Sequence, residues 1–178
     1  SDIFNRFQLN GIKFVQTWGG CVYHMTCRGS RRNTVDKAKN IYEDSPEWLA
    51  QNQRSTRNFI RKWGHFVKHD ALMKPIIPSK YDIGFILKGN NFDLLNMLEP
   101  WCSTIYADPH MIQDYIQAEQ QNTIMNLYDR VKPYDNEKNN EILVTIDSST
   151  FNQQDFGYIQ QLSEILADSG EPAFHGEL

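Results

Sequence analysis

The spacing of apolar residues predicts short helical and extended segments in the first part of the chain. Apolar side chains recur at helical spacing over residues 3–9, which predicts a short helix, and Asn10-Gly11 supplies a left-handed stop after it. The apolar runs at residues 12–18 and 21–24 predict two short strands, with a glycine turn between them.

A longer helix is predicted from about Pro46 to about Trp63. Ser45 is a favourable N-cap, because its hydroxyl can accept a hydrogen bond from a free amide of the first turn. Pro46 suits the first helical position, where the amide hydrogen that it lacks would be unpaired anyway. Gly64 is expected to end the helix.

A proline-containing linker at residues 75–80 precedes a more regular pattern. Beyond it, strand-like and helix-like segments alternate. Strands are expected at 81–87, 103–106, 141–146 and 174–178, helices at 91–98 and 151–168, and a mostly helical segment at 109–131. This alternation predicts an α/β fold, either a small ferredoxin-like sandwich or a compact open sheet. We therefore expect two domains, residues 1–74 and an α/β accessory domain over residues 80–178.

The composition is that of an ordinary globular protein, and charge narrows the functions that fit it. Hydrophobic residues make up 40% of the 178 positions and aromatic residues 12%, which is enough bulk for a core. The net charge of −4 argues against a general nucleic-acid binder, which would carry a strong basic excess. Basic residues nevertheless concentrate in the N-terminal half, which suggests a local anion site. Two clusters stand out, one of Arg28, Arg31 and Arg32, and one of Arg54, Arg57, Arg61, Lys62 and Lys68.

Cysteine number and hydropathy bear on the compartment. Three cysteines are too few for a disulfide framework, which favours a reducing environment and a cytoplasmic location. No apolar stretch approaches the roughly 20 residues that a membrane-spanning helix needs.

Three segments of the N-terminal part follow one another in an order that a known family shares. The first, Asp2-Ile3-Phe4-Asn5-Arg6-Phe7-Gln8-Leu9-Asn10-Gly11, is a helix that begins with an acid and ends at a glycine. The second, Val22-Tyr23-His24, is a strand end that finishes in histidine, and the third combines Asn58-Phe59 with Lys62-Trp63-Gly64. Together they resemble the C-terminal part of a GT-A-fold glycosyltransferase catalytic domain, of the galactosyltransferase-like or family 2 kind.

This resemblance implies the transfer of a sugar from a nucleotide-sugar donor to a hydroxyl of a glycan or another acceptor. By the same resemblance, His24 would help to hold a divalent metal ion, Mn²⁺ or Mg²⁺, and Asp2 would be a catalytic-site carboxylate on the acceptor side. Arg28, Arg31 and Arg32 would bind the diphosphate, whose charge a metal ion and arginines can neutralise as it leaves.

The chain also departs from the family's pattern. In that family the catalytic base lies in an acidic cluster just before the position of Asp2, and here that position would precede Ser1. The Asp-x-Asp metal motif of the nucleotide-binding half does not occur in the sequence. We therefore expect the catalytic domain to be incomplete, and the chain alone not to be a competent transferase.

Simpler interpretations stay open for each of these residues. Asp2 is also explained as a helix N-terminal acid that the helix dipole favours. His24 is also explained as a histidine at a strand end that has no functional role, and the three arginines as residues of a solvated loop. A zinc site at Cys21, His24 and Cys27 is disfavoured, because structural zinc normally has four ligands.

Further interpretations concern other parts of the chain. Trp63 and Trp101 are predicted to be core residues rather than sugar platforms, and residues 119–121 are predicted to lie on a solvated helix face. The main alternative function is a non-catalytic binding or assembly module, and homo-oligomerisation is the observation that would distinguish it. The least favoured one is nucleic-acid handling by the basic helix at residues 54–68.

Overall fold

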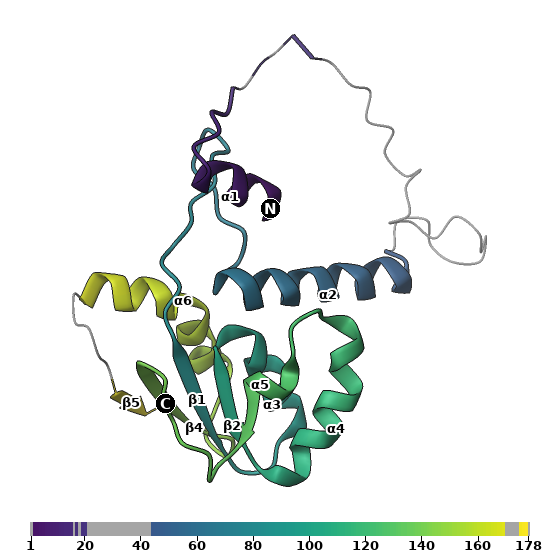
Figure 1. Ribbon diagram of the computed structural model, residues 1–178, viewed down its shortest axis with the longest axis vertical. Coiled ribbons are helices and arrows are strands. Elements are labelled where there is room, and N and C mark those ends of the chain that lie inside the picture. Colours follow the sequence, from purple (N-terminus) through teal and green to yellow (C-terminus); the bar gives the residue numbers. More distant parts are fainter. Residues whose placement is uncertain (1, 16, 18, 21–43, 170–174, 178) are drawn as a thin grey trace.

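The computed structural model of the protein describes residues 2–15, 17, 19–20, 44–169 and the backbone of residues 175–177 (Figure 1). Five strands form one sheet in the order β3-β2-β1-β4-β5, and every neighbouring pair is parallel. The strands are β1 Ile83–Lys88, β2 Thr104–Ala107, β3 Val131–Pro133, β4 Ile142–Asp147 and β5 His175–Glu177.

The helices alternate with these strands beyond residue 80, and two more precede them. They are α1 Asp2–Leu9, α2 Pro46–Trp63, α3 Phe92–Leu98, α4 Pro109–Glu119, α5 Leu127–Arg130 and α6 Gln153–Ser169. Two 3₁₀ turns, η1 Glu99–Trp101 and η2 Gln120–Asn122, follow α3 and α4 directly. The predicted α/β class is confirmed, and the all-parallel pairing is that of the open sheet rather than the ferredoxin-like sandwich.

The bounds of α2 follow the predicted caps. The Ser45 hydroxyl accepts a hydrogen bond from the Trp48 amide at 3.2 Å, and Pro46 occupies the first turn. Gly64 ends the helix in the left-handed conformation with φ of 80°, which glycine adopts without steric cost.

One prediction of secondary structure is refined, and one is corrected. The segment at residues 109–131 is mostly helical as predicted, but it is divided into α4, the turn η2 and α5. The Gln120 side chain holds the turn between these two helices. Its Nε2 donates to the Thr123 and Met125 carbonyls, and its Oε1 accepts from the Leu127 amide, so that the chain turns and continues into α5 and β3.

The N-terminal segment agrees with the prediction only in part. Helix α1 ends at Leu9 as expected, but residues 12–15 of the predicted strand have no regular secondary structure. The second predicted strand, residues 21–24, lies outside the described residues.

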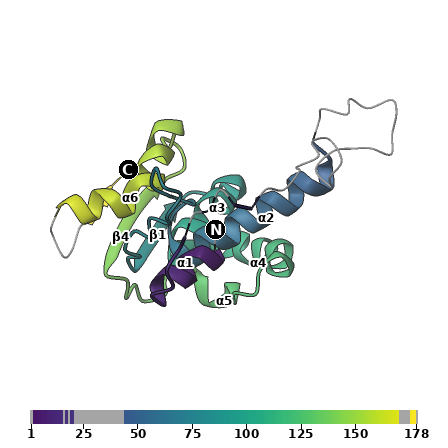
Figure 2. The same ribbon diagram turned by 90° about the horizontal axis from the view of Figure 1, so that it is seen from above.

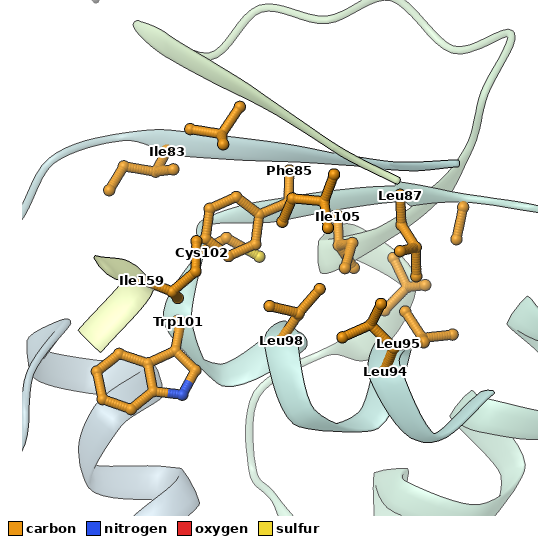
Figure 3. Packing of buried hydrophobic residues seen from close by; sticks show 14 of the residues in the cluster. Ile83, Phe85, Leu87, Leu94, Leu95, Leu98, Trp101, Cys102, Ile105 and Ile159 are labelled. Carbon is orange, nitrogen blue, oxygen red and sulfur yellow. The ribbon is translucent and has the colours of Figure 1, made fainter. Parts of the chain in front are cut away.

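The core lies between the sheet and the helices that pack on one of its faces. Figure 3 shows Phe85 and Leu87 of β1 on the same side as Leu95 of α3 and Ile159 of α6. Trp101 belongs to this core, with 7% of its surface exposed, which confirms its predicted role. Its ring meets those of Phe66 and Phe156 edge-on.

The segment at residues 134–141 crosses the opposite face of β1 and β2. The Tyr106 hydroxyl donates to Asn140 Oδ1 at 3.0 Å, and Asn140 Nδ2 donates to Asp82 Oδ1 at 2.8 Å. Gly84 of β1 lies under this contact, where a β-carbon would collide with Asn140 and with Leu143. This segment therefore covers the second face of β1 at Gly84, whereas Ile86 on that face is half-buried.

Helix α2 lies across the end of the sheet at which β1 begins, and α1 lies beside the C-terminal end of α2 (Figure 1, Figure 2). Ile60 of α2 is buried in the same hydrophobic core as the strands. The domain boundary predicted at residues 75–80 stays a prediction. Among the described residues, no helix is long and apolar enough to cross a membrane.

Candidate functional site

A groove of about 710 Å³ lies between α2 and the turn that follows α4. This volume falls within the roughly 300–1,000 Å³ of small-molecule sites. One wall consists of residues on α2, together with Asp2 from α1, and the opposite wall is the turn at residues 121–125. The lining residues are Asp2, Arg54, Ser55, Asn58, Phe59, Lys62, Gln121, Asn122, Thr123, Ile124 and Met125.

Asp2 is fixed at one end of this groove by two residues of α2. Its Oδ1 accepts from Lys62 Nζ at 2.5 Å and from Trp63 Nε1 at 2.8 Å. The bond from Lys62 is the main cause that lowers the pKa of Asp2, so the carboxylate is ionised at neutral pH. Trp63 is thus half-buried, with its polar edge bonded to Asp2 rather than enclosed in the core.

The opposite wall is tied to α2 by Asn58. Its Nδ2 donates to the Asn122 carbonyl at 2.7 Å, and its Oδ1 accepts from Arg61 at 3.1 Å. Because both ends of the Asn58 amide are engaged, the spacing between helix and turn is set by these bonds. Ile124, which is fully exposed, forms an apolar rim on the turn.

Beneath the groove, α2 is held by a buried network of charges. Arg61, with 1% of its surface exposed, donates to Glu99 Oε2 at 2.8 Å and to Glu119 Oε1 at 2.6 Å. Arg57 donates to the same Glu119 oxygen at 2.9 Å. Arg130 approaches Glu99 from the other side and donates to Oε1 at 2.6 Å. One fully buried carboxylate thus joins α2 to the α5 end of the α/β unit.

Burial and charge act in opposite directions on these carboxylates. Burial alone would raise the pKa of Glu99, but Arg130 and Arg61 outweigh it and keep that pKa below its usual range. Burial likewise opposes the charge of Glu119, and Arg61 and Arg57 lower its pKa. Both acids are therefore charged partners of the arginines at neutral pH.

This network corrects the prediction of a solvated helix face for Glu119 and Gln120, whereas Gln121 is exposed as predicted. Glu119 is largely shielded and bound by two arginines, and the Gln120 side chain is used to end α4. Arg57 and Arg61 point inward to acids, so they are not part of an exposed basic surface. The sequence offered one signal: Arg57 and Arg61 are four positions apart, beside buried Ile60.

The remaining predicted site residues cannot be placed in this geometry. His24, Arg28, Arg31 and Arg32 lie outside the described residues, as do Cys21 and Cys27. Of the predicted site, the structure describes Asp2 alone, and it brings Asp2 together with the Asn58-Phe59 and Lys62-Trp63 segments. Within the described residues there is no group of three or more histidines, cysteines or acids placed to hold a metal ion.

Comparison with known proteins adds no relative. A scan against protein-family models found no match, and neither did searches of curated proteins and of solved structures. The residues themselves and their geometry are therefore the observations that bear on function.

Proposed function

We propose that this chain is part of a glycosyltransferase that moves a sugar from a nucleotide-sugar donor to an acceptor hydroxyl, and that the groove at Asp2 receives the acceptor. One observation carries the proposal. Asp2 comes from one segment, and Asn58, Phe59 and Lys62 come from a second segment 56 or more positions further along the chain. Both segments resemble the same enzyme family, and these four residues line one groove.

The chemistry of the groove suits a ligand that carries hydroxyls. Asn122 and Gln121 offer amide groups, Asp2 offers a carboxylate, and Phe59 offers an apolar surface for the C–H face of a sugar ring. Within the described residues both bonds to Asp2 end on Oδ1, which leaves Oδ2 to accept from an acceptor hydroxyl.

The lowered pKa defines what Asp2 would do in the reaction. A carboxylate held ionised by Lys62 is a weak base, and a general base works best when its pKa lies near the working pH. In this proposal Asp2 therefore orients the acceptor hydroxyl, and proton removal falls to another group.

The donor side of the proposal rests on residues that the sequence singles out. His24 would bind Mn²⁺ or Mg²⁺, and Arg28, Arg31 and Arg32 would neutralise the diphosphate. A cytoplasmic location belongs to the same proposal, with Cys102 buried as a free thiol whose pKa burial raises to about 12.

Thermal melting of the chain with Mn²⁺ and UDP-glucose, UDP-galactose or UDP-N-acetylglucosamine tests the donor side. A ligand that binds only the native state raises the melting temperature by mass action. We expect a rise that needs both the metal and one nucleotide sugar, is lost in His24→Ala, and persists in the matched control His110→Ala, which alters an exposed histidine on α4. No rise with any of the three donors would overturn the proposal.

The acceptor side has its own test. With donor and metal present, methyl glucoside or methyl galactoside is expected to raise the melting temperature further. Asp2→Asn should reduce this second rise to the rise that the same sugar gives without donor and metal, whereas Asp168→Asn, which changes an exposed acid at the end of α6, should keep it in full. An unchanged second rise in Asp2→Asn would exclude the proposed role of Asp2.

A second candidate, a binding or assembly module, is favoured by one observation. Helix α1 and the chain after it expose large apolar side chains: Ile3, Phe4, Phe7, Leu9, Ile12 and Val15 are between 37% and 77% exposed. Such a surface marks an interaction site in many proteins. Light scattering distinguishes the two: a stable homodimer without nucleotide affinity supports assembly, and a monomer that binds donor supports the transferase.

A further inference from the structure

Strands β1 and β4 finish at the end of the sheet opposite to α2 (Figure 1). A second hollow is lined by the residues that follow these two strands. These two strands are neighbours, but the chain leaves β1 toward β2 on one side and leaves β4 toward β5 on the other. In open α/β sheets, ligands bind outside the carboxyl ends of strands at such a reversal of direction. The structure places a crevice of about 330 Å³ there.

The two loops that form the floor of this crevice touch each other. Gly89, directly after β1, has φ of 92°, and a β-carbon there would collide with the Ser148 hydroxyl. The Ser148 amide donates to the Lys88 carbonyl at 3.0 Å and extends the pairing of the two strands by one bond. The floor is therefore fixed by the sheet itself rather than by long loops.

The crevice walls carry polar groups that the fold does not use. Asn91 Oδ1 caps α3 by accepting from the Leu94 amide at 3.0 Å, and Asn152 Oδ1 accepts from the Gln154 amide at 2.8 Å. Within the described residues, several other polar groups of the lining make no hydrogen bond. They are the Asn91 and Asn152 Nδ2 groups, the Asp93 carboxylate, the Gln153 side-chain amide and the Ser148 hydroxyl; Asp93, Asn152 and Gln153 are exposed, and Asn91 and Ser148 are half-buried.

The other lining residues are apolar, and none is basic. Leu94, Met97 and Phe151 complete the wall. Lys88, the nearest cation in the sequence, ends β1 with its side chain on the face opposite to that of Leu87, away from the helices. Without a cation, a crevice with a carboxylate on its rim disfavours phosphate and other anions. The first turn after β1 also contains a single glycine, rather than the glycine-rich pattern of dinucleotide sites.

From these observations we infer that the crevice between the β1–α3 and β4–α6 loops binds a neutral carbohydrate unit. A sugar ring offers hydroxyls that donate to Asp93 and accept from the Asn91, Asn152 and Gln153 amides, and a C–H face that packs on Phe151. The inference does not depend on the proposed function, because the crevice and the groove at Asp2 lie at opposite ends of the α/β unit (Figure 1).

An NMR titration of the whole chain with methyl β-glucoside, methyl β-galactoside and methyl α-mannoside, each up to tens of millimolar, tests this site. We expect at least one of them to shift the backbone amide signals of residues 89–94 and 148–153 in a saturable way. Signals from residues 54–62 report on the groove at Asp2, so only the crevice signals decide this test.

Matched variants decide whether the crevice is the binding site. Asp93→Asn and Gln153→Ala should each weaken binding roughly tenfold, since each removes a hydrogen-bonding partner. Gln161→Ala, which changes an exposed glutamine further along α6, should leave the affinity unchanged. The spectrum of each variant also reports whether it is folded.

Three results would overturn the inference. One is the absence of saturable crevice shifts with all three glycosides. The second is binding that Asp93→Asn and Gln153→Ala leave intact. The third is saturation of the crevice by inorganic phosphate or ADP in place of the glycosides, because an anion site contradicts the charge argument. A failed donor test with a positive crevice titration would reject the transferase and keep this site.

Discussion

Replacing Glu99 by glutamine tests how strongly the buried charges hold α2 on the sheet. Glu99 is fully buried and accepts from Arg61, Tyr115 and Arg130 at 2.6–2.9 Å. Glutamine keeps the shape but removes the charge, and its amide presents donors to arginine groups that are donors themselves. Glu99→Gln therefore leaves Arg61 buried with only the partly shared Glu119 as a counter-charge.

The expected loss follows from what a broken buried pair costs. Removing one partner of such a pair destabilises a protein by about 3–5 kcal/mol, because the other charge stays buried without compensation. Against a total stability of about 5–15 kcal/mol, this is a large fraction. At about 2–4 °C per kcal/mol for a protein of this size, the melting temperature should fall by about 6–20 °C.

The stability that Glu99 contributes should also depend on pH. The pKa of folded Glu99 lies below its usual value, so its contribution to stability is complete above the unfolded pKa of about 4.3 and is lost as the pH falls below it. The gap between the wild type and Glu99→Gln should therefore be widest near neutral pH and should narrow in acid.

Thermal unfolding followed by circular dichroism, at pH 7 and at pH 3.5, measures both effects. Glu137→Gln, which alters an exposed glutamate in the loop before β4, is the matched control and should change the melting temperature little. A decrease in melting temperature of less than about 2 °C for Glu99→Gln would refute the reasoning that the charges are buried and paired. A difference between wild type and variant that is the same at both pH values would refute it as well.

Three further predictions use the same unfolding assay. Burial lowers the pKa of His65, so the free energy of unfolding should fall from pH 7 to pH 5 as the unfolded chain takes up a proton. His65→Gln should make this dependence on pH weaker. The same pH dependence in wild type and variant would show that His65 does not cause it. Gly84→Ala should cost about 1–3 kcal/mol through its collision with Asn140, and a neutral result would show that Asn140 can move aside. Ser45→Ala should cost about 1 kcal/mol by removing the bond to the Trp48 amide, whereas no loss would mean that Pro46 alone starts the helix.

The parts of the fold that local chemistry decides could be predicted from the sequence. The caps of α2 at Ser45 and Gly64 are local signals, and the helix begins and ends where they predict. The alternation beyond residue 80 likewise predicts the α/β class, because helical and extended spacings differ within a few residues. Strand β3, Val131–Pro133, was not predicted, because it is only three residues long and follows α5 directly.

The parts that depend on distant partners could not be predicted. Gln120 ends α4 through bonds to residues on the far side of a turn, which no helical pattern reveals. The sequence pattern around Glu119 predicts a solvated side chain, because its partners Arg57 and Arg61 are about 60 positions away in the chain. The sequence singled out Asp2 as a site residue, but its pairing with Lys62 required the fold.

The network around Glu99 links stability to the candidate site. One face of helix α2 forms a wall of the groove, and another face carries Arg57 and Arg61. The position of α2 on the sheet therefore determines both the shape of the groove and the geometry of the ion pairs. An apolar contact would tolerate small shifts of α2, whereas bonds of fixed length and direction to Glu99 and Glu119 define a single register. A variant such as Arg61→Met that folded stably should therefore widen or narrow the groove without touching a lining residue, and ligand affinity at the groove would report that change while the crevice beyond β1 and β4 stays the same.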